Sequence, residues 1–182
     1  MGIHRNLKHA AGRFRWEERA MFHVFSDLEG IRIAIEMERR GESFYRHAAR
    51  VSKSEETVEM LLSLANEEQY HRAEFERLLS AECARGASDC AYDDETNAYL
   101  TAIAAEVVFP KGLMALKDEG FENPEAVLLH AIASEKDSIL FYTEMQQRTA
   151  DDHSREVFGE IVRQERGHLF RLQRRLAQLM QE

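Results

Sequence analysis

Four long stretches of the chain place hydrophobic residues every three or four positions, the spacing of a helix with one buried face. The first follows a capping box made by Ser26 and Glu29. The second ends before Gly86, and the third begins with Asn123 in front of Pro124, a helix start signal. The pattern therefore predicts four helices, over about 27–50, 55–84, 124–149 and 152–180.

The lengths of the connections predict how these helices are arranged. Only a few residues separate the first two helices, and only a few separate the last two, so each pair should form an antiparallel hairpin. A long crossover, 87–123, joins the hairpins and should contain short helices near 95–107 and 111–118. We expect an all-α, ferritin-like four-helix bundle over 26–182, preceded by a separate N-terminal segment, 1–25.

Composition agrees with a helical domain and excludes several classes of partner. The 182 residues include only 9 Gly and 2 Pro, too few for many tight turns. A net charge of −9 argues against nucleic acid or an anionic membrane surface as a partner. With two cysteines, no secretory signal pattern and no apolar run of the roughly 20 residues that a membrane span needs, we expect a cytoplasmic protein in a reducing compartment.

An internal repeat carries the candidate chemistry. When the first hairpin is laid over the second with an offset of 97 residues, identical residues of scarce types coincide. The coincident pairs are Glu38 with Glu135, Tyr45 with Tyr142, Glu68 with Glu165, and His71 with His168. We infer two duplicated hairpins related by a pseudo-two-fold axis.

The repeated acids and histidines lie on the hydrophobic stripes of their helices, where they should point into the bundle. Four mutually repelling carboxylates cannot all be buried and ionised without cations. The alternative interpretation is an internal polar network, or a misphased helix that leaves these residues at the surface. Two divalent ions would balance the four negative charges. Each Glu-x-x-His pair could hold one ion, and Glu38 and Glu135 could reach across or bridge both.

The segments AIEMERRGESFY, LANEEQYH, AIASEKDSILFY and IVRQERGH resemble the rubrerythrin branch of the ferritin-like superfamily. The resemblance implies a homodimer with a di-iron centre that reduces hydrogen peroxide or oxygen. It implies metal ligands at Glu38, Glu68, His71, Glu135, Glu165 and His168, with Tyr45 and Tyr142 as supports for those ligands. The ligands would also suit manganese or a mixed pair of metals.

Two departures from the family pattern change the expected reaction. The chain lacks the four-cysteine rubredoxin domain, so electrons would have to come from an external donor protein. Where rubrerythrins carry an additional Glu, this chain has Ser138, and the matching position in the first helix is Gly41, so there is room for an exogenous ligand.

Two alternative functions follow from the same residues. The first is iron handling, in which ferrous iron is oxidised and then released. The second is a metal-stabilised interaction module that binds a partner through apolar residues of the crossover, namely Val107, Val108, Phe109, Leu113 and Met114.

Overall fold

A computed structural model describes residues 25–86, 90, 94–106, 121 and 123–181. The described residues form an all-helical fold, as the sequence predicts. Its helices are α2 (Asp27–Val51), α3 (Glu55–Ala84), α4 (Asp94–Glu106), α6 (Pro124–Arg148) and α7 (Asp152–Leu179). The expected N-terminal segment, apart from Phe25, and the expected short helix at 111–118 lie outside these residues.

Local capping interactions explain where the long helices begin. The Ser26 hydroxyl accepts a hydrogen bond from the backbone N–H of Glu29, whose carboxylate accepts from the backbone N–H of Ser26 in return. Asn123 caps α6 in front of Pro124, where a missing N–H costs nothing. These contacts satisfy N–H groups that have no partner within the helix. The helix starts could therefore be predicted from short segments of sequence.

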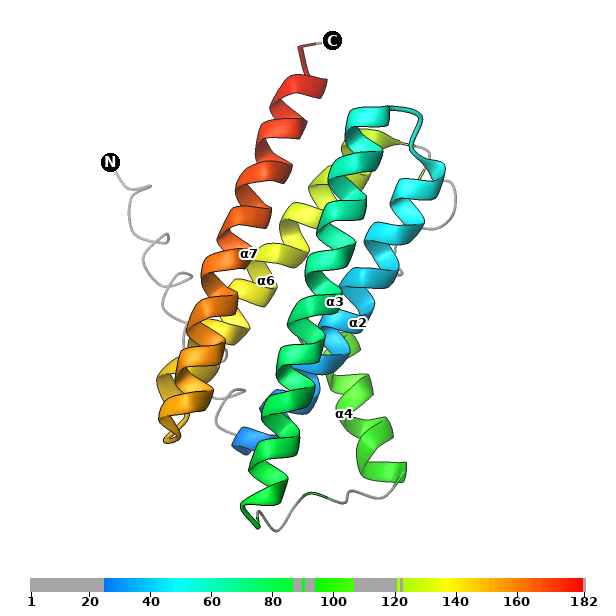
Figure 1. Ribbon diagram of the computed structural model, residues 1–182. Coiled ribbons are helices and arrows are strands. Elements are labelled where there is room, and N and C mark those ends of the chain that lie inside the picture. The colour runs from blue at the N-terminus through cyan, green and yellow to red at the C-terminus, as the bar shows by residue number, and fades with distance from the viewer. Residues whose placement is uncertain (1–24, 87–89, 91–93, 107–120, 122, 182) are drawn as a thin grey trace, which may run out of the picture.

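The four long helices form two antiparallel hairpins that pack side by side (Figure 1). α2 packs mainly on α3, and α6 packs mainly on α7. The hairpins meet through contacts of α3 with α7 and of α2 with α6. The crossover between them includes α4, which packs against α2 and buries Leu100. This is the predicted bundle with a long crossover.

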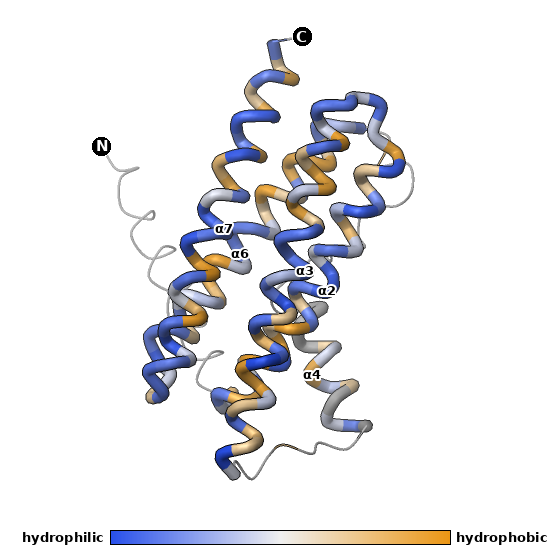
Figure 2. Tube along the Cα trace, in the orientation of Figure 1, coloured by the Kyte–Doolittle hydropathy of each residue, from blue (hydrophilic) through white to orange (hydrophobic). Residues whose placement is uncertain are grey.

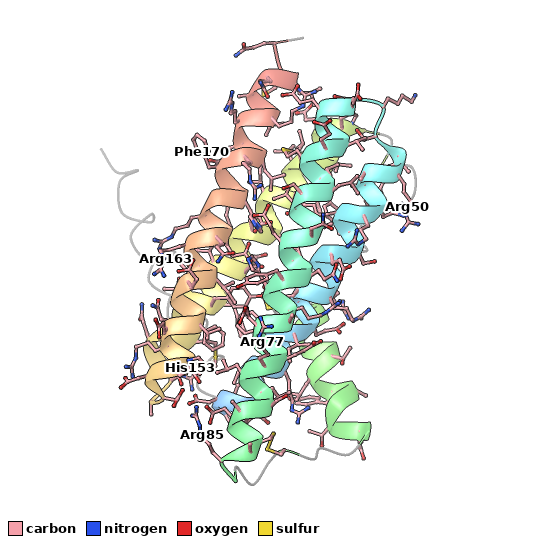
Figure 3. All side chains as sticks on the ribbon, viewed as in Figure 1. Arg50, Arg77, Arg85, His153, Arg163 and Phe170 are labelled. Carbon is pink, nitrogen blue, oxygen red and sulfur yellow. A yellow bond between two sulfur atoms is a disulfide. The ribbon has the colours of Figure 1, made fainter. Side chains whose placement is uncertain are left out.

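The core follows the inward faces of the four long helices. It includes Phe75, Phe141 and Phe158, which are almost fully buried. Hydrophobic and hydrophilic positions alternate along each long helix (Figure 2), as expected for helices that bury one face. Side chains such as Arg50 and Arg163 lie at the outside of the bundle (Figure 3). Within the described part of the chain, no helix is long and apolar enough to cross a membrane.

The C-terminal end of α3 is tied to its surroundings by two kinds of bond. Arg85, labelled in Figure 3, donates to Asp151 at the start of α7 with an N–O distance of 2.8 Å. Gly86 has a φ of 90°, and Cys83 and Cys90 lie 5.4 Å apart at their Cα atoms and form a disulfide. Stable disulfides are typical of oxidising compartments, so this pairing is not what the expected reducing compartment predicts.

Candidate metal centre

The structure brings the six sequence-predicted ligand residues together in the middle of the bundle. One glutamate comes from each of α2 and α6, and a Glu-x-x-His pair comes from each of α3 and α7. All six side chains are buried, with residue exposures of 0–5%. They are Glu38, Glu68, His71, Glu135, Glu165 and His168.

These residues form two groups of four, and each group offers ligand atoms within 4.8 Å of one another. One group contains Glu38 and His71, and the other contains Glu135 and His168. Glu68 and Glu165 belong to both groups. The geometry therefore favours Glu68 and Glu165 as shared ligands, and not Glu38 and Glu135, for which the sequence had allowed a bridging position.

Glu165 lies at the centre of the arrangement. One of its carboxylate oxygens lies 3.0 Å from Nδ1 of His71, and the other lies 2.9 Å from Nδ1 of His168. The two imidazole rings stack with centroids 5.3 Å apart and planes inclined by 16°. Both histidines thus direct Nδ1 to the same carboxylate from opposite hairpins.

Several of these buried atoms have no hydrogen-bond partner, which is the feature that fits a metal centre. The unsatisfied atoms are Oε2 of Glu38, both carboxylate oxygens of Glu165, and Nδ1 of both His71 and His168. They approach one another closely without hydrogen-bond geometry. Unsatisfied buried polar atoms are costly, and oxygen and imidazole nitrogen are suitable ligands for iron or manganese. The residues therefore fit two metal ions.

The same crowding shifts the acid–base properties of the site. Burial, reinforced by the charge of Glu165, raises the pKa of Glu135 from 4.5 to about 8. Burial and the charges of Glu165 and Glu38 raise the pKa of Glu68 as well. Burial alone would lower the pKa of His71, but the close carboxylates of Glu165 and Glu38 raise it to about 12. The metal-free site therefore retains protons at neutral pH, and metal binding must release them.

Two tyrosines cross between the hairpins to support the outer glutamates. The phenol of Tyr142, on α6, donates a hydrogen bond of 2.6 Å to Oε1 of Glu38 on α2. Tyr45, on α2, donates in the same way to Oε1 of Glu135 on α6. Burial and, to a smaller extent, the charges of the nearby carboxylates raise the pKa of both phenols well above 10, so both phenols remain protonated donors. Both phenols thus contact candidate ligands, and their function as supports for those ligands stays a prediction.

Two polar residues that the sequence analysis did not single out also contact the histidines. Oε2 of Glu67 lies 3.1 Å from Nε2 of His168, and Oε1 of Gln164 lies 2.9 Å from Nε2 of His71. Glu67 and Gln164 are separated by the same 97 residues as the ligand pairs. That spacing was the signal that could have identified them.

A two-hairpin helical bundle with a buried set of four glutamates and two histidines defines the class of ferritin-like dinuclear carboxylate proteins. Within that class, the family model for rubrerythrin matches residues 29–169 and again 126–182. The chain therefore belongs to the rubrerythrin family.

Structural comparison supports the fold. A hypothetical protein from Pyrococcus furiosus is similar, with a TM-score of 0.66 and 20% sequence identity over 86% of this chain and 92% of the other. No curated protein matches the sequence significantly.

Replacing Tyr142 by Phe should weaken metal binding by about 10- to 100-fold, because an outer hydrogen bond that orients a ligand is then lost. A competition titration with a metal-binding dye measures the change. The control is Tyr99→Phe, since Tyr99 lies on α4 and is 60% exposed. Equal affinities for the native protein and Tyr142→Phe would show that this hydrogen bond does not position Glu38.

Proposed function

We propose that this protein is a non-haem di-iron oxidoreductase of the rubrerythrin type. It reduces hydrogen peroxide or oxygen with electrons from an external donor protein. The observation that carries the proposal is the pair of buried four-residue groups that share Glu68 and Glu165. Such a set of four carboxylates and two imidazoles matches the charge and ligand preferences of two divalent ions.

Each of the six residues has a distinct position in the proposed centre. Glu68 and Glu165 would hold both ions, while Glu38 with His71 and Glu135 with His168 would complete the two halves. Two ferrous ions supply, when bound, the two electrons of the overall reaction, in which hydrogen peroxide, two protons and two electrons give two molecules of water. The external donor protein would supply the two electrons that each further turnover needs. We further propose that the chain acts as a cytoplasmic homodimer.

The rest of the bundle positions these ligands and excludes water. Tyr45 and Tyr142 hold the outer glutamates by hydrogen bonds from opposite hairpins. Next to the site, the rings of Phe75 and Phe158 pack against Tyr142 with centroid distances of 5.2 and 6.1 Å. These apolar neighbours keep the site poor in water, which strengthens electrostatic interactions within it.

A small cavity lies beside the carboxylates. It measures about 10 Å³, close to the volume that one water molecule needs. Its lining includes Gly41, Ser134 and Ser138 as well as Glu68 and Glu135. The absence of a larger side chain at positions 41 and 138 leaves this space next to the proposed ligands.

Stopped-flow oxidation of the anaerobic, ferrous-loaded protein tests the proposal. We expect faster oxidation by hydrogen peroxide than by oxygen, and several turnovers with iron retained when a reductant is supplied. Release of ferric iron after one oxidation would support iron handling instead. If neither oxidant reacted, the oxidoreductase proposal would be wrong.

The cavity provides a matched variant for the same experiment. Ser138→Leu should fill the space beside the centre, so that the oxidation rate falls at least 10-fold while two irons remain bound. Ser43→Leu, at an exposed position of α2, serves as the control for the added side chain. An unchanged rate in Ser138→Leu would mean that the oxidant reaches the centre by another path.

A further inference from the structure

The two histidines of the centre differ in the residue that contacts the outer side of each ring. Both histidines are completely buried and direct Nδ1 to the glutamates. Nε2 of His168 faces a carboxylate, that of Glu67, at 3.1 Å. Nε2 of His71 faces an amide, that of Gln164, at 2.9 Å.

These two contacts are the same contact in the two halves of the repeat. Glu67 directly precedes Glu68 on α3 and reaches across to the histidine of α7. Gln164 directly precedes Glu165 on α7 and reaches across to the histidine of α3. Because the geometry is duplicated, the main chemical difference at these two positions is the replacement of a carboxylate by an amide.

Neighbouring side chains fix Glu67 as a carboxylate. Arg171 donates two hydrogen bonds to it, at 2.8 and 2.7 Å, and the hydroxyl of Ser63 donates a third at 3.0 Å. Glu67 therefore presents a negatively charged acceptor to the imidazole.

Neighbouring side chains also fix the orientation of Gln164. Its amide nitrogen donates to Oε1 of Glu160 at 3.1 Å, which leaves the amide oxygen to face His71. Arg171, the anchor of Glu67, corresponds in the repeat to Glu74. The half that contains His71 thus has the neutral acceptor Gln164 in place of Glu67. It also has an acid, Glu74, in place of Arg171.

An acceptor at Nε2 keeps the proton on that nitrogen and leaves Nδ1 free to bind a metal ion. A charged acceptor forms a stronger hydrogen bond than a neutral one, and it makes the imidazole a better electron donor. Outer contacts of this kind typically change metal affinity by about 10- to 100-fold. The two halves should therefore differ in affinity.

We propose that the two halves of the centre bind divalent metal unequally, and that Glu67 is the positioning residue that makes the half containing His168 fill first. This proposal rests on the dinuclear centre described under the proposed function. It leaves the half containing His71 as the position from which an ion is more easily exchanged.

The order of filling can be observed directly with zinc, which is diamagnetic and binds such sites at least as strongly as ferrous iron. One equivalent of Zn²⁺ is added to the metal-free protein, and the ring nitrogens of ¹⁵N-labelled histidines are followed by NMR. The signals of His71 are assigned by their loss in His71→Gln. We expect the signals of His168 to shift with the first equivalent, and those of His71 with the second.

Exchanging the two outer residues should exchange this order. In Glu67→Gln both halves have an amide, so both histidines should respond together, and the affinity of the first step should fall about 10- to 100-fold in calorimetry. In the double variant Glu67→Gln with Gln164→Glu, His71 should respond first. Glu59→Gln removes the same charge from an exposed position of α3 and should change nothing.

The outcomes separate this proposal from the one on which it rests. The inference is wrong if the native protein binds two zinc ions but fills the half of His71 first. It is also wrong if Glu67→Gln fills the two halves in the same order as the native protein, because Glu67 then does not set the difference in affinity. If the native protein binds no zinc at all, the proposal of a dinuclear centre is wrong, and so is this inference.

Discussion

Removing bound metal at pH 8 should lower the melting temperature of this protein by about 10–20 °C. An ion present at 100 times its dissociation constant adds about 2.7 kcal/mol of stability, and 1 kcal/mol changes the melting temperature of a chain of this size by about 2–4 °C. Two ions therefore account for the expected shift. Calorimetry before and after chelation measures it.

The fall in melting temperature on metal removal should be larger at pH 8 than at pH 5.5. The pKa of Glu135 is about 8 in the folded chain, against 4.5 for an ordinary glutamate. A carboxyl group with a raised folded-state pKa loses its stabilising contribution as the pH rises between these two values, because the folded state keeps a proton that the unfolded state releases. The raised pKa of His71 acts in the same direction from about pH 6.5 upwards. The metal-free protein should therefore become less stable as the pH rises.

Bound metal replaces those protons, so the metal-loaded protein should not lose stability as the pH rises. The difference in melting temperature between the loaded and the metal-free protein should therefore increase with pH. Glu165→Gln provides the control, because a variant that cannot hold the ions should melt at the same temperature with and without chelator. A native melting temperature that chelation leaves unchanged at both pH values would contradict a buried metal centre.

Replacing Glu165 by Gln should remove both metal ions, whereas replacing Glu38 by Gln should remove only one. Glu165 contacts both histidines and belongs to both groups of ligands, while Glu38 belongs to one. Glu68 is shared in the same way, so Glu68→Gln should also lose both ions. Gln keeps the size of the side chain and removes the charge that the ions require.

Elemental analysis after anaerobic loading with ferrous iron and gel filtration gives the stoichiometry. We expect two irons per chain in the native protein, one in Glu38→Gln and none in Glu165→Gln. Glu36→Gln is the matched control, because Glu36 lies two residues before Glu38 but pairs with Arg39 and Arg40. Two irons retained in Glu165→Gln would refute the shared position of this residue.

The helices could be predicted closely because the signals that start and stop them are local. The capping contacts of Ser26 and Asn123 involve residues within three positions, and the observed helix ends differ from the predicted ones by one residue at most. The candidate ligands could be predicted for a related reason. An acid such as Glu68 on a hydrophobic stripe must be buried, and the repeat marks its partner Glu165.

The contacts between the hairpins could not be predicted in the same way. The sequence allowed Glu38 and Glu135 to bridge the ions, but the structure gives the shared position to Glu68 and Glu165. The hydrogen bond between Glu67 and His168 joins residues 101 positions apart. Nor did the sequence predict the disulfide between Cys83 and Cys90.

The sequence by itself determined the helices, their pairing into duplicated hairpins, and the six polar residues that face inward, because periodicity and capping act over one or two helical turns. Only the tertiary structure decided which carboxylates the two halves share and which outer residue each histidine contacts. Those relations depend on the axial register and packing of α3 against α7 and of α2 against α6, which no local pattern in the chain encodes.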